Sequence, residues 1–197
     1  EFAKIAKEFN VHIVEDGCHA LGGAYLDNKN NYVKVGSCQY STMSTFSFHP
    51  IKNITTGEGG AITTNDKNLY EHLLRLRSHG LTRDPNLFQN KSLGFSKVDN
   101  DLVANPWYYE MHDLAYNYRI TDFQCALGRS QLNKLDSFVK RRNDLADIYC
   151  NELQDKLSQI VIPLTNSKNI VNAYHLFVVR IPFHRLKGGR AALMLFL

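Results

Sequence analysis

Short apolar runs that alternate with helical patterns are the feature of this sequence that most limits its fold. Residues 11–14 form a mostly apolar run that ends at residues 15–16, as a buried strand ends before a functional turn. Residues 45–48 indicate a second strand, which Pro50 stops, and residues 59–64 indicate a third strand after a glycine-rich turn. The order of these elements predicts an α/β protein.

Two helices are predicted around these strands. Residues 1–9 have the spacing of an amphipathic helix. Asn65 or Asp66 can cap a second helix that runs to about His79 and closes at Gly80. The apolar face of the first helix would consist of Phe2, Ile5, Ala6 and Phe9.

A long loop and a long helical stretch are predicted in the second half of the chain. Residues 81–106 are polar and contain two prolines, which favours a loop. Thr121 and Gln124 have the spacing of a capping box, and the helical stretch that follows is expected to break near residues 135–136. A final strand is predicted over residues 174–181. The candidate core positions of the helical stretch are Leu127, Leu132, Leu135, Phe138, Val139, Leu145 and Ile148.

Composition limits the partners and the compartment that we expect. The net charge of +4, from 23 basic and 19 acidic residues, is too small and too scattered to indicate nucleic-acid binding, and the basic run at residues 140–142 fits a solvated helix face. No apolar run reaches membrane-spanning length, and the opening residues do not have the pattern of a signal peptide. The four cysteines form no Cys-x-x-Cys pair, so we expect a reduced, cytoplasmic protein.

Polar groups follow the predicted strands at the positions where ligands bind in α/β sheets. These are Asp16, Ser47 with His49, and Lys52. Pyridoxal phosphate (PLP) needs a lysine amine, a carboxylate near its pyridine nitrogen and donors for its phosphate, and this set can supply all three. Each residue alone is weak evidence, since a single Asp after a strand is more often a turn former and a single Lys in a loop is usually solvated.

The combined motifs carry a more specific signal. Residues 14–22 (VEDGCHALG) resemble the Glu-Asp-x-x-His-Ala-x-Gly segment of the DegT/DnrJ/EryC1/StrS family of sugar aminotransferases. Residues 47–52 (SFHPIK) with residues 56–60 (TGEGG) are similar to the cofactor loop of that family. Residues 116–122 (YNYRITD) resemble its Tyr-Asn-Tyr-Arg segment, and residues 77–80 also match. The motifs occur in family order and span most of the chain.

This resemblance implies a type I PLP-dependent fold, like that of aspartate aminotransferase, with three α/β/α layers in a homodimer that shares its active sites. Lys52 would bind the cofactor covalently and carry protons, and Asp16 would hold the pyridine nitrogen. His19 would lie beside the cofactor ring, Ser47 would bind the phosphate, and Asn117 would reach the phosphate of the neighbouring subunit. The roles of His19 and Asn117 come from the resemblance alone.

The resemblance also implies how the chain divides. Residues 1–135 would be the C-terminal part of the PLP-binding large domain, and residues 136–197 would be a linking helix and the beginning of a truncated small domain. We expect the chain to be a fragment, inactive by itself. Asp16 and Lys52 are further apart in sequence than we expect for the family, and residues 27–34 are the predicted insertion, as an exposed loop.

A narrower resemblance concerns one branch of the family. Residues 15–23, 47–52 and 107–111 are similar to the branch that transfers an amino group from glutamate to a UDP-linked 4-keto-6-deoxy sugar in pseudaminic acid synthesis. A nucleotide-linked sugar and glutamate are therefore the expected substrates. The sequence does not define the stereochemistry of the sugar, its nucleotide or the carbon that is aminated.

Three alternatives remain open at the level of sequence. A sugar dehydratase of the same fold has a histidine in place of the lysine; Lys52 argues against this function, although His49 leaves the question to experiment. A regulatory or scaffold protein could retain the fold without catalysis. A metal protein that uses histidines or cysteines is disfavoured, because their spacing matches no zinc pattern.

Overall fold

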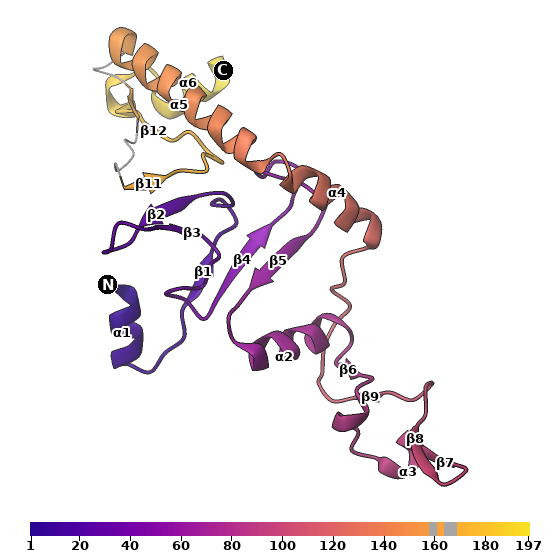
Figure 1. Cartoon of the computed structure of the whole chain (residues 1–197). Helices are drawn as coiled ribbons and strands as arrows, with labels where there is room; N and C mark the ends of the chain where they lie inside the picture. Colours follow the sequence, from indigo (N-terminus) through magenta and orange to yellow (C-terminus); the bar gives the residue numbers. More distant parts are fainter. Residues whose placement is uncertain (158–160, 164–168) are drawn as a thin grey trace. The chain divides into compact units, whose positions relative to one another are not determined.

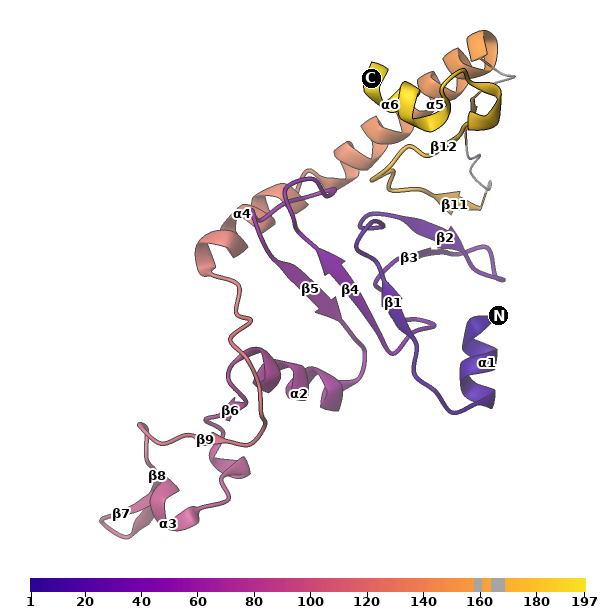
Figure 2. The same cartoon turned by 180° about the vertical axis from the view of Figure 1, so that it is seen from behind.

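Two compact units make up the chain in the computed structural model, which describes all residues except 158–160 and 164–168. The first unit combines residues 1–63 with residues 122–197, and the second unit consists of residues 64–121. Helices and strands are mixed along the sequence, as the colours of Figures 1 and 2 show. The α/β class predicted from the sequence is therefore confirmed.

The first unit holds a small central sheet, a second sheet beside it and two consecutive long helices. Its elements are α1 (Phe2–Glu8), β1 (Val14–Asp16), β2 (Ala24–Leu26), β3 (Tyr32–Lys34), β4 (Met43–Ser47), β5 (Gly60–Thr63), α4 (Asp122–Leu132), α5 (Leu135–Leu157), β10 (Ile162–Pro163), β11 (Ile170–Val171), β12 (Val179–Arg180), the 3-10 turn η2 (Phe183–Arg185) and α6 (Gly189–Phe196).

The central sheet joins β1, β4 and β5. β1 pairs with β4 in parallel, with Asp16 opposite Thr45, and β4 pairs with β5 in antiparallel, with Ser47 opposite Gly60. Because parallel strands end at the same edge of a sheet, the last residues of β1 and β4 lie at one edge, beside the start of β5. The first strand is shifted from its predicted bounds, since pairing begins only where Val14 lies opposite Met43.

Phe46 on β4 determines where glycine is needed around this sheet. Side chains alternate along β4, so that Phe46 is buried with 8% of its surface exposed. A Cβ on Gly36, whose φ is +87°, would lie 2.4 Å from Cζ of Phe46. A Cβ on Gly17 would lie 2.8 Å from the same ring. The phenyl ring thus occupies the space that side chains at these two glycines would take.

The second sheet contains the predicted insertion. β2 pairs with β3 as an antiparallel hairpin and with β11 on its other side. The turn at residues 27–31 is closed by Asp27, whose carboxylate accepts hydrogen bonds from the N–H groups of Lys29 and Asn31 at 2.8 and 2.9 Å. The prediction of an exposed loop over residues 27–34 is correct for the turn and wrong for β3, because Val33 is buried.

A buried cluster fixes the loop that follows β4. Ile54, two residues after Lys52, packs with Leu135 and Val139, which lie one turn apart on the same face of α5. Burial of an aliphatic side chain contributes roughly 1.5–3 kcal/mol. The partly buried side chains that pack against this cluster are Leu21, Phe48 and Val171.

The remaining predictions for the helical stretch are partly wrong. The break comes at residues 133–134, slightly before the predicted position. Four of the seven candidate core residues are between 38% and 53% exposed, because only one face of the stretch packs against the cluster around Ile54. These exposed residues are Leu127, Leu132, Leu145 and Ile148. The predicted strand over residues 174–181 is reduced to β12, which pairs with β10.

The second unit contains more regular structure than its sequence predicted. Asp66 caps its first helix, since the carboxylate accepts the N–H of Leu69 at 3.0 Å. The predicted loop over residues 81–106 is wrong: it includes an antiparallel hairpin that turns at Asp99, whose φ of +54° suits Asp in a tight turn. The elements are α2 (Lys67–Arg77), β6 (Leu81–Thr82), η1 (Pro85–Leu87), α3 (Lys91–Gly94), β7 (Phe95–Val98), β8 (Asp101–Ala104) and β9 (Glu110–Met111).

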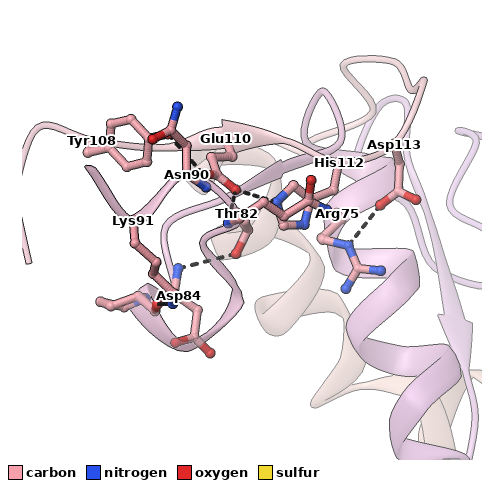
Figure 3. A network of polar contacts seen from close by, with 11 residues as sticks. Arg75, Thr82, Asp84, Asn90, Lys91, Tyr108, Glu110, His112 and Asp113 are labelled. Carbon is pink, nitrogen blue, oxygen red and sulfur yellow. Dashed lines mark hydrogen bonds and ion pairs between the residues drawn. The ribbon is translucent and has the colours of Figure 1, made fainter. Parts of the chain in front are cut away.

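Glu110 is the polar centre of this unit (Figure 3). Its carboxylate accepts the N–H groups of Gln89 and Asn90 at 2.7 and 2.8 Å, and the hydroxyl of Tyr108 at 2.8 Å. The Nε2 atom of His112 lies 2.7 Å from the same carboxylate. These contacts, with the Gln89 N–H first, lower the pKa of Glu110 from 4.5 to about 2. One carboxylate thus joins β9 to the segment before α3.

Substitution of Gly36 by Ala should destabilise the protein through overlap with Phe46. Gly57 also has a positive φ, of +81°, but a Cβ there would meet nothing within 4 Å, so Gly57→Ala is a matched control for backbone strain alone. We expect Gly36→Ala to lower the free energy of unfolding by about 1–3 kcal/mol more than Gly57→Ala, as overpacking does. Urea unfolding of both variants measures this difference, and equal losses would contradict the packing of Phe46.

The low pKa of Glu110 predicts acid sensitivity of the second unit. The folded pKa lies below the ordinary value, so the stabilisation is present above pH 4.5 and is lost as the pH falls toward 2. Fluorescence of Trp107, the single Trp of the chain, reports unfolding of this unit. Glu110→Gln should remove most of this pH dependence, whereas Glu152→Gln, in an exposed pair with Lys156, should leave it unchanged. The same dependence in Glu110→Gln would show that another group causes it.

Candidate active site

Asp16 is the last residue of β1 and begins the turn that carries the first motif. Its Oδ1 atom accepts the N–H of Cys18 at 3.0 Å, a local bond that Asp favours at turns. Gly17 is buried and donates its N–H to the carbonyl of Thr45 at 2.9 Å, which holds the turn against β4. The carboxylate is exposed to solvent at the edge where β1 and β4 end.

Lys52 lies in the loop between β4 and β5. Ser47 ends β4, and its hydroxyl accepts the N–H of His49 at 3.4 Å. The N–H of Lys52 donates to the carbonyl of His49 at 2.9 Å, so the chain turns across Pro50. Lys52 is half-buried, whereas the two residues that follow it are buried. This loop starts at the same sheet edge as the turn of Asp16.

The charge on Asp16 is stabilised by its neighbours. Hydrogen bonds from the side chain and the N–H of Cys18 are the largest causes that hold the pKa of Asp16 below its usual range. The positive charges of His19 and Lys52 lower this pKa further. The neighbouring Asp16 carboxylate in turn raises the pKa of the Cys18 thiol, which donates to the carbonyl of Thr45 at 3.9 Å. Asp16 is therefore an anion at neutral pH, with Lys52 near enough to interact with it.

His19 contacts His175, a residue that the sequence did not indicate as part of the site. Its ring centroid lies 4.3 Å from that of His175, at an interplanar angle of 53°. In the sequence, His175 falls only within the predicted strand over residues 174–181, and no spacing connects it with His19. The pKa of His175 is lowered by burial first, and then by the charges of His19, Lys52 and Arg142.

The first unit thus contains four of the five predicted site residues, and Asn117 belongs to the second unit. Asp16, His19 and Lys52 interact electrostatically, and Ser47 ends the strand beside Asp16. Asn117 is exposed and forms an isolated antiparallel bridge with Ser78. The roles of these five residues stay predictions.

Across the described parts of the chain, no group of three His, Cys, Asp or Glu side chains is arranged to hold a metal ion. Among the described helices, none combines the length and the apolar character needed to cross a membrane.

The whole chain, residues 1–197, matches the family model of the DegT/DnrJ/EryC1/StrS aminotransferases. The chain belongs to this family. The predicted recognition from the motifs around Asp16, Lys52 and Asn117 is confirmed at the level of the family.

Relatives and solved structures agree with this assignment. The chain is 38% identical over 154 residues to the UDP-4-amino-4,6-dideoxy-N-acetyl-beta-L-altrosamine transaminase of Campylobacter jejuni subsp. jejuni serotype O:23/36 (strain 81-176), which covers 78% of this chain and 34% of that protein. Helicobacter pylori PseC, an aminotransferase of pseudaminic acid biosynthesis, matches with a TM-score of 0.72 and 30% identity over 91% of this chain and 40% of that one. The PLP form of Streptococcus pneumoniae Spr1654 matches with a TM-score of 0.67 and 28% identity over 90% and 39%.

These comparisons confirm the predicted fold as that of the PLP-dependent sugar aminotransferases. They also show that the chain spans between a third and about two fifths of the length of these relatives. The dehydratase and non-catalytic alternatives are not favoured by relatives that are named as transaminases.

The hydrogen bonds of Cys18 predict a measurable change at Asp16. Cys18→Ala removes the largest cause of the low Asp16 pKa, so this pKa should rise toward its ordinary value while staying lowered by the backbone N–H. A ¹³C NMR titration of labelled Asp carboxyl groups measures it. Cys125→Ala, at an exposed position of α4, is the control and should cause no change. An unaltered titration of Asp16 in Cys18→Ala would exclude the thiol as its partner.

Proposed function

We propose that this chain carries the cofactor-binding part of a PLP-dependent aminotransferase. The enzyme would move an amino group from glutamate to a nucleotide-linked 4-keto-6-deoxy sugar. The observation that carries the proposal is the edge of the central sheet, where an ionised carboxylate (Asp16), a hydroxyl (Ser47) and the loop of Lys52 come together. The match to the aminotransferase family over the whole chain supports it.

The residues at this edge fit PLP chemically. Asp16 is a carboxylate that stays ionised, as a partner of a protonated pyridine nitrogen must. Ser47 offers a hydroxyl, and the loop of residues 56–60 lies opposite the end of β4, where backbone N–H groups can approach a phosphate. Lys52 is held on both sides of its position by the turn at His49 and by buried Ile54.

The chain's own residues would then have distinct tasks. When bound, PLP supplies the electron sink that makes a proton on the donor carbon acidic. Lys52 would take this proton at Nζ and deliver one to the amino acceptor in the second half of the reaction. Asp16 would keep the proton on the ring nitrogen, and His19 would lie beside the ring. Ser47 would hold the phosphate.

The rest of the proposal extends to the whole protein. Asn117 would reach the phosphate of the neighbouring subunit in a homodimer with shared active sites, in the cytoplasm. The boundary at residue 135 between large and small domain is part of this proposal.

A UDP-linked sugar of the pseudaminic acid route is the favoured acceptor, since relatives at 34% to 38% identity are named as altrosamine transaminases.

Covalent trapping tests the cofactor lysine directly. The intact protein is incubated with PLP, reduced with borohydride and digested, and the pyridoxyl-labelled peptide is located by mass spectrometry. We expect label confined to Lys52, because its charge acts on the Asp16 carboxylate that would orient the ring. Lys52→Ala should lose the label and all turnover, whereas Lys97→Ala, on the exposed hairpin, should keep both. Near-normal turnover by Lys52→Ala would falsify the assignment.

A further inference from the structure

A short segment after β11 is held by an unusual set of side chains. Residues 172–175, here termed the carbonyl arm, present three successive backbone carbonyls, and each accepts a hydrogen bond from a different side chain. Asn143 Nδ2 donates to Asn172 at 2.9 Å, Asn53 Nδ2 donates to Ala173 at 2.7 Å, and Arg142 Nη1 donates to Tyr174 at 2.7 Å. In Figures 1 and 2 the chain after β11 runs back along α5, which supplies two of these donors.

The arm has a backbone conformation that requires this support. Tyr174 has a φ of +44°, in the left-handed region that is unfavourable for a bulky residue. Its N–H donates to the side chain of Asn172 at 2.9 Å, and Ala173 is 2% exposed. Such strain persists only where the surroundings over-determine the backbone, and it gathers at functional sites. The result of the turn at Tyr174 is the placement of His175.

His175 is oriented by the arm and by its contact with His19. Its Nδ1 atom is buried and has no hydrogen-bond partner in the described residues. The contact of its ring with His19, at 4.3 Å between centroids and an interplanar angle of 53°, is a ring–ring packing contact. Burial and the nearby positive charges lower the pKa of His175, which favours its neutral form. A neutral ring can lie beside Lys52 without repelling it.

Asn53 connects the arm to the lysine. It follows Lys52 in sequence, is 5% exposed and gives its side-chain amide to the arm. The loop of Lys52 and the ring beside His19 are thus joined by one buried hydrogen bond between segments 120 residues apart.

We infer that His175 is a positioning residue of the proposed active site, held by the carbonyl arm so that its ring sets the place of the His19 ring. This rests on the proposed function, in which His19 lies beside the cofactor. His175 acts through packing, so an aromatic ring without nitrogens should replace it, whereas a small side chain should not.

The experiment uses the intact protein with His175→Ala, His175→Phe and Asn53→Ala, and with His184→Ala as control at an exposed histidine of η2. Four quantities are measured: the borohydride label on Lys52, the ¹H–¹³C ring signals of His19, kcat, and KM for glutamate. We expect His175→Ala to shift the His19 signals and lower kcat by about 10- to 100-fold with the label retained, as misplacement of a reacting group does. His175→Phe should restore the ring-current shift of His19 and most of kcat.

The outcomes separate this inference from the proposed function. If wild-type protein shows no label on Lys52, the proposed function fails and the inference fails with it. If Lys52 is labelled in wild type and variants, but His175→Ala matches His184→Ala in kcat and His19 signals, only the positioning role is overturned. If His175→Ala does not fold, the other two variants decide. His19 signals that do not shift in Asn53→Ala would overturn the positioning role. A loss of all turnover in His175→Phe, with Lys52 still labelled, would overturn it as well.

Discussion

The parallel pairing of β1 with β4 is the constraint on which the candidate site depends. With Asp16 opposite Thr45, both strands end at one edge of the sheet, and the antiparallel return of β5 places Gly60 beside Ser47. Phe46 stabilises this arrangement, because its ring occupies the space beside Gly17 and Gly36. A side chain at either glycine would push against β4 and so against the loop of Lys52. Packing inside the sheet and the position of the lysine are therefore parts of one arrangement.

A second layer of contacts fixes the loop after β4. Ile54 inserts into the cluster of Leu135 and Val139, and Asn53 bonds the carbonyl of Ala173. Lys52 itself stays half-buried between these anchored residues and the turn at His49. Buried neighbours of this kind fix the backbone on either side of Lys52. The side chain can therefore stay accessible while its position is defined by the packing of the residues around it.

The second unit achieves order by a different means. It has few buried apolar residues in the described structure, and Glu110 gathers four donors around one carboxylate instead. Asp113 adds an ion pair with Arg75 at 2.8 Å, which lowers the pKa of Asp113. The periodicity of apolar residues does not detect order that rests on polar contacts. This is the physical reason that the sequence of residues 81–106 predicts a loop.

The sequence by itself determined the α/β class, the family, the start of α2 near Asn65 or Asp66 and the turn residues around Asp16 and Lys52. These follow from local patterns: apolar runs, a capping carboxylate and motifs in fixed order. Only the tertiary structure decided which predicted core residues are buried, that a hairpin lies within residues 81–106, and that His175 contacts His19. The physical reason is that burial, cross-strand pairing and the ring contact join segments far apart in the chain, and no local spacing encodes which of them meet.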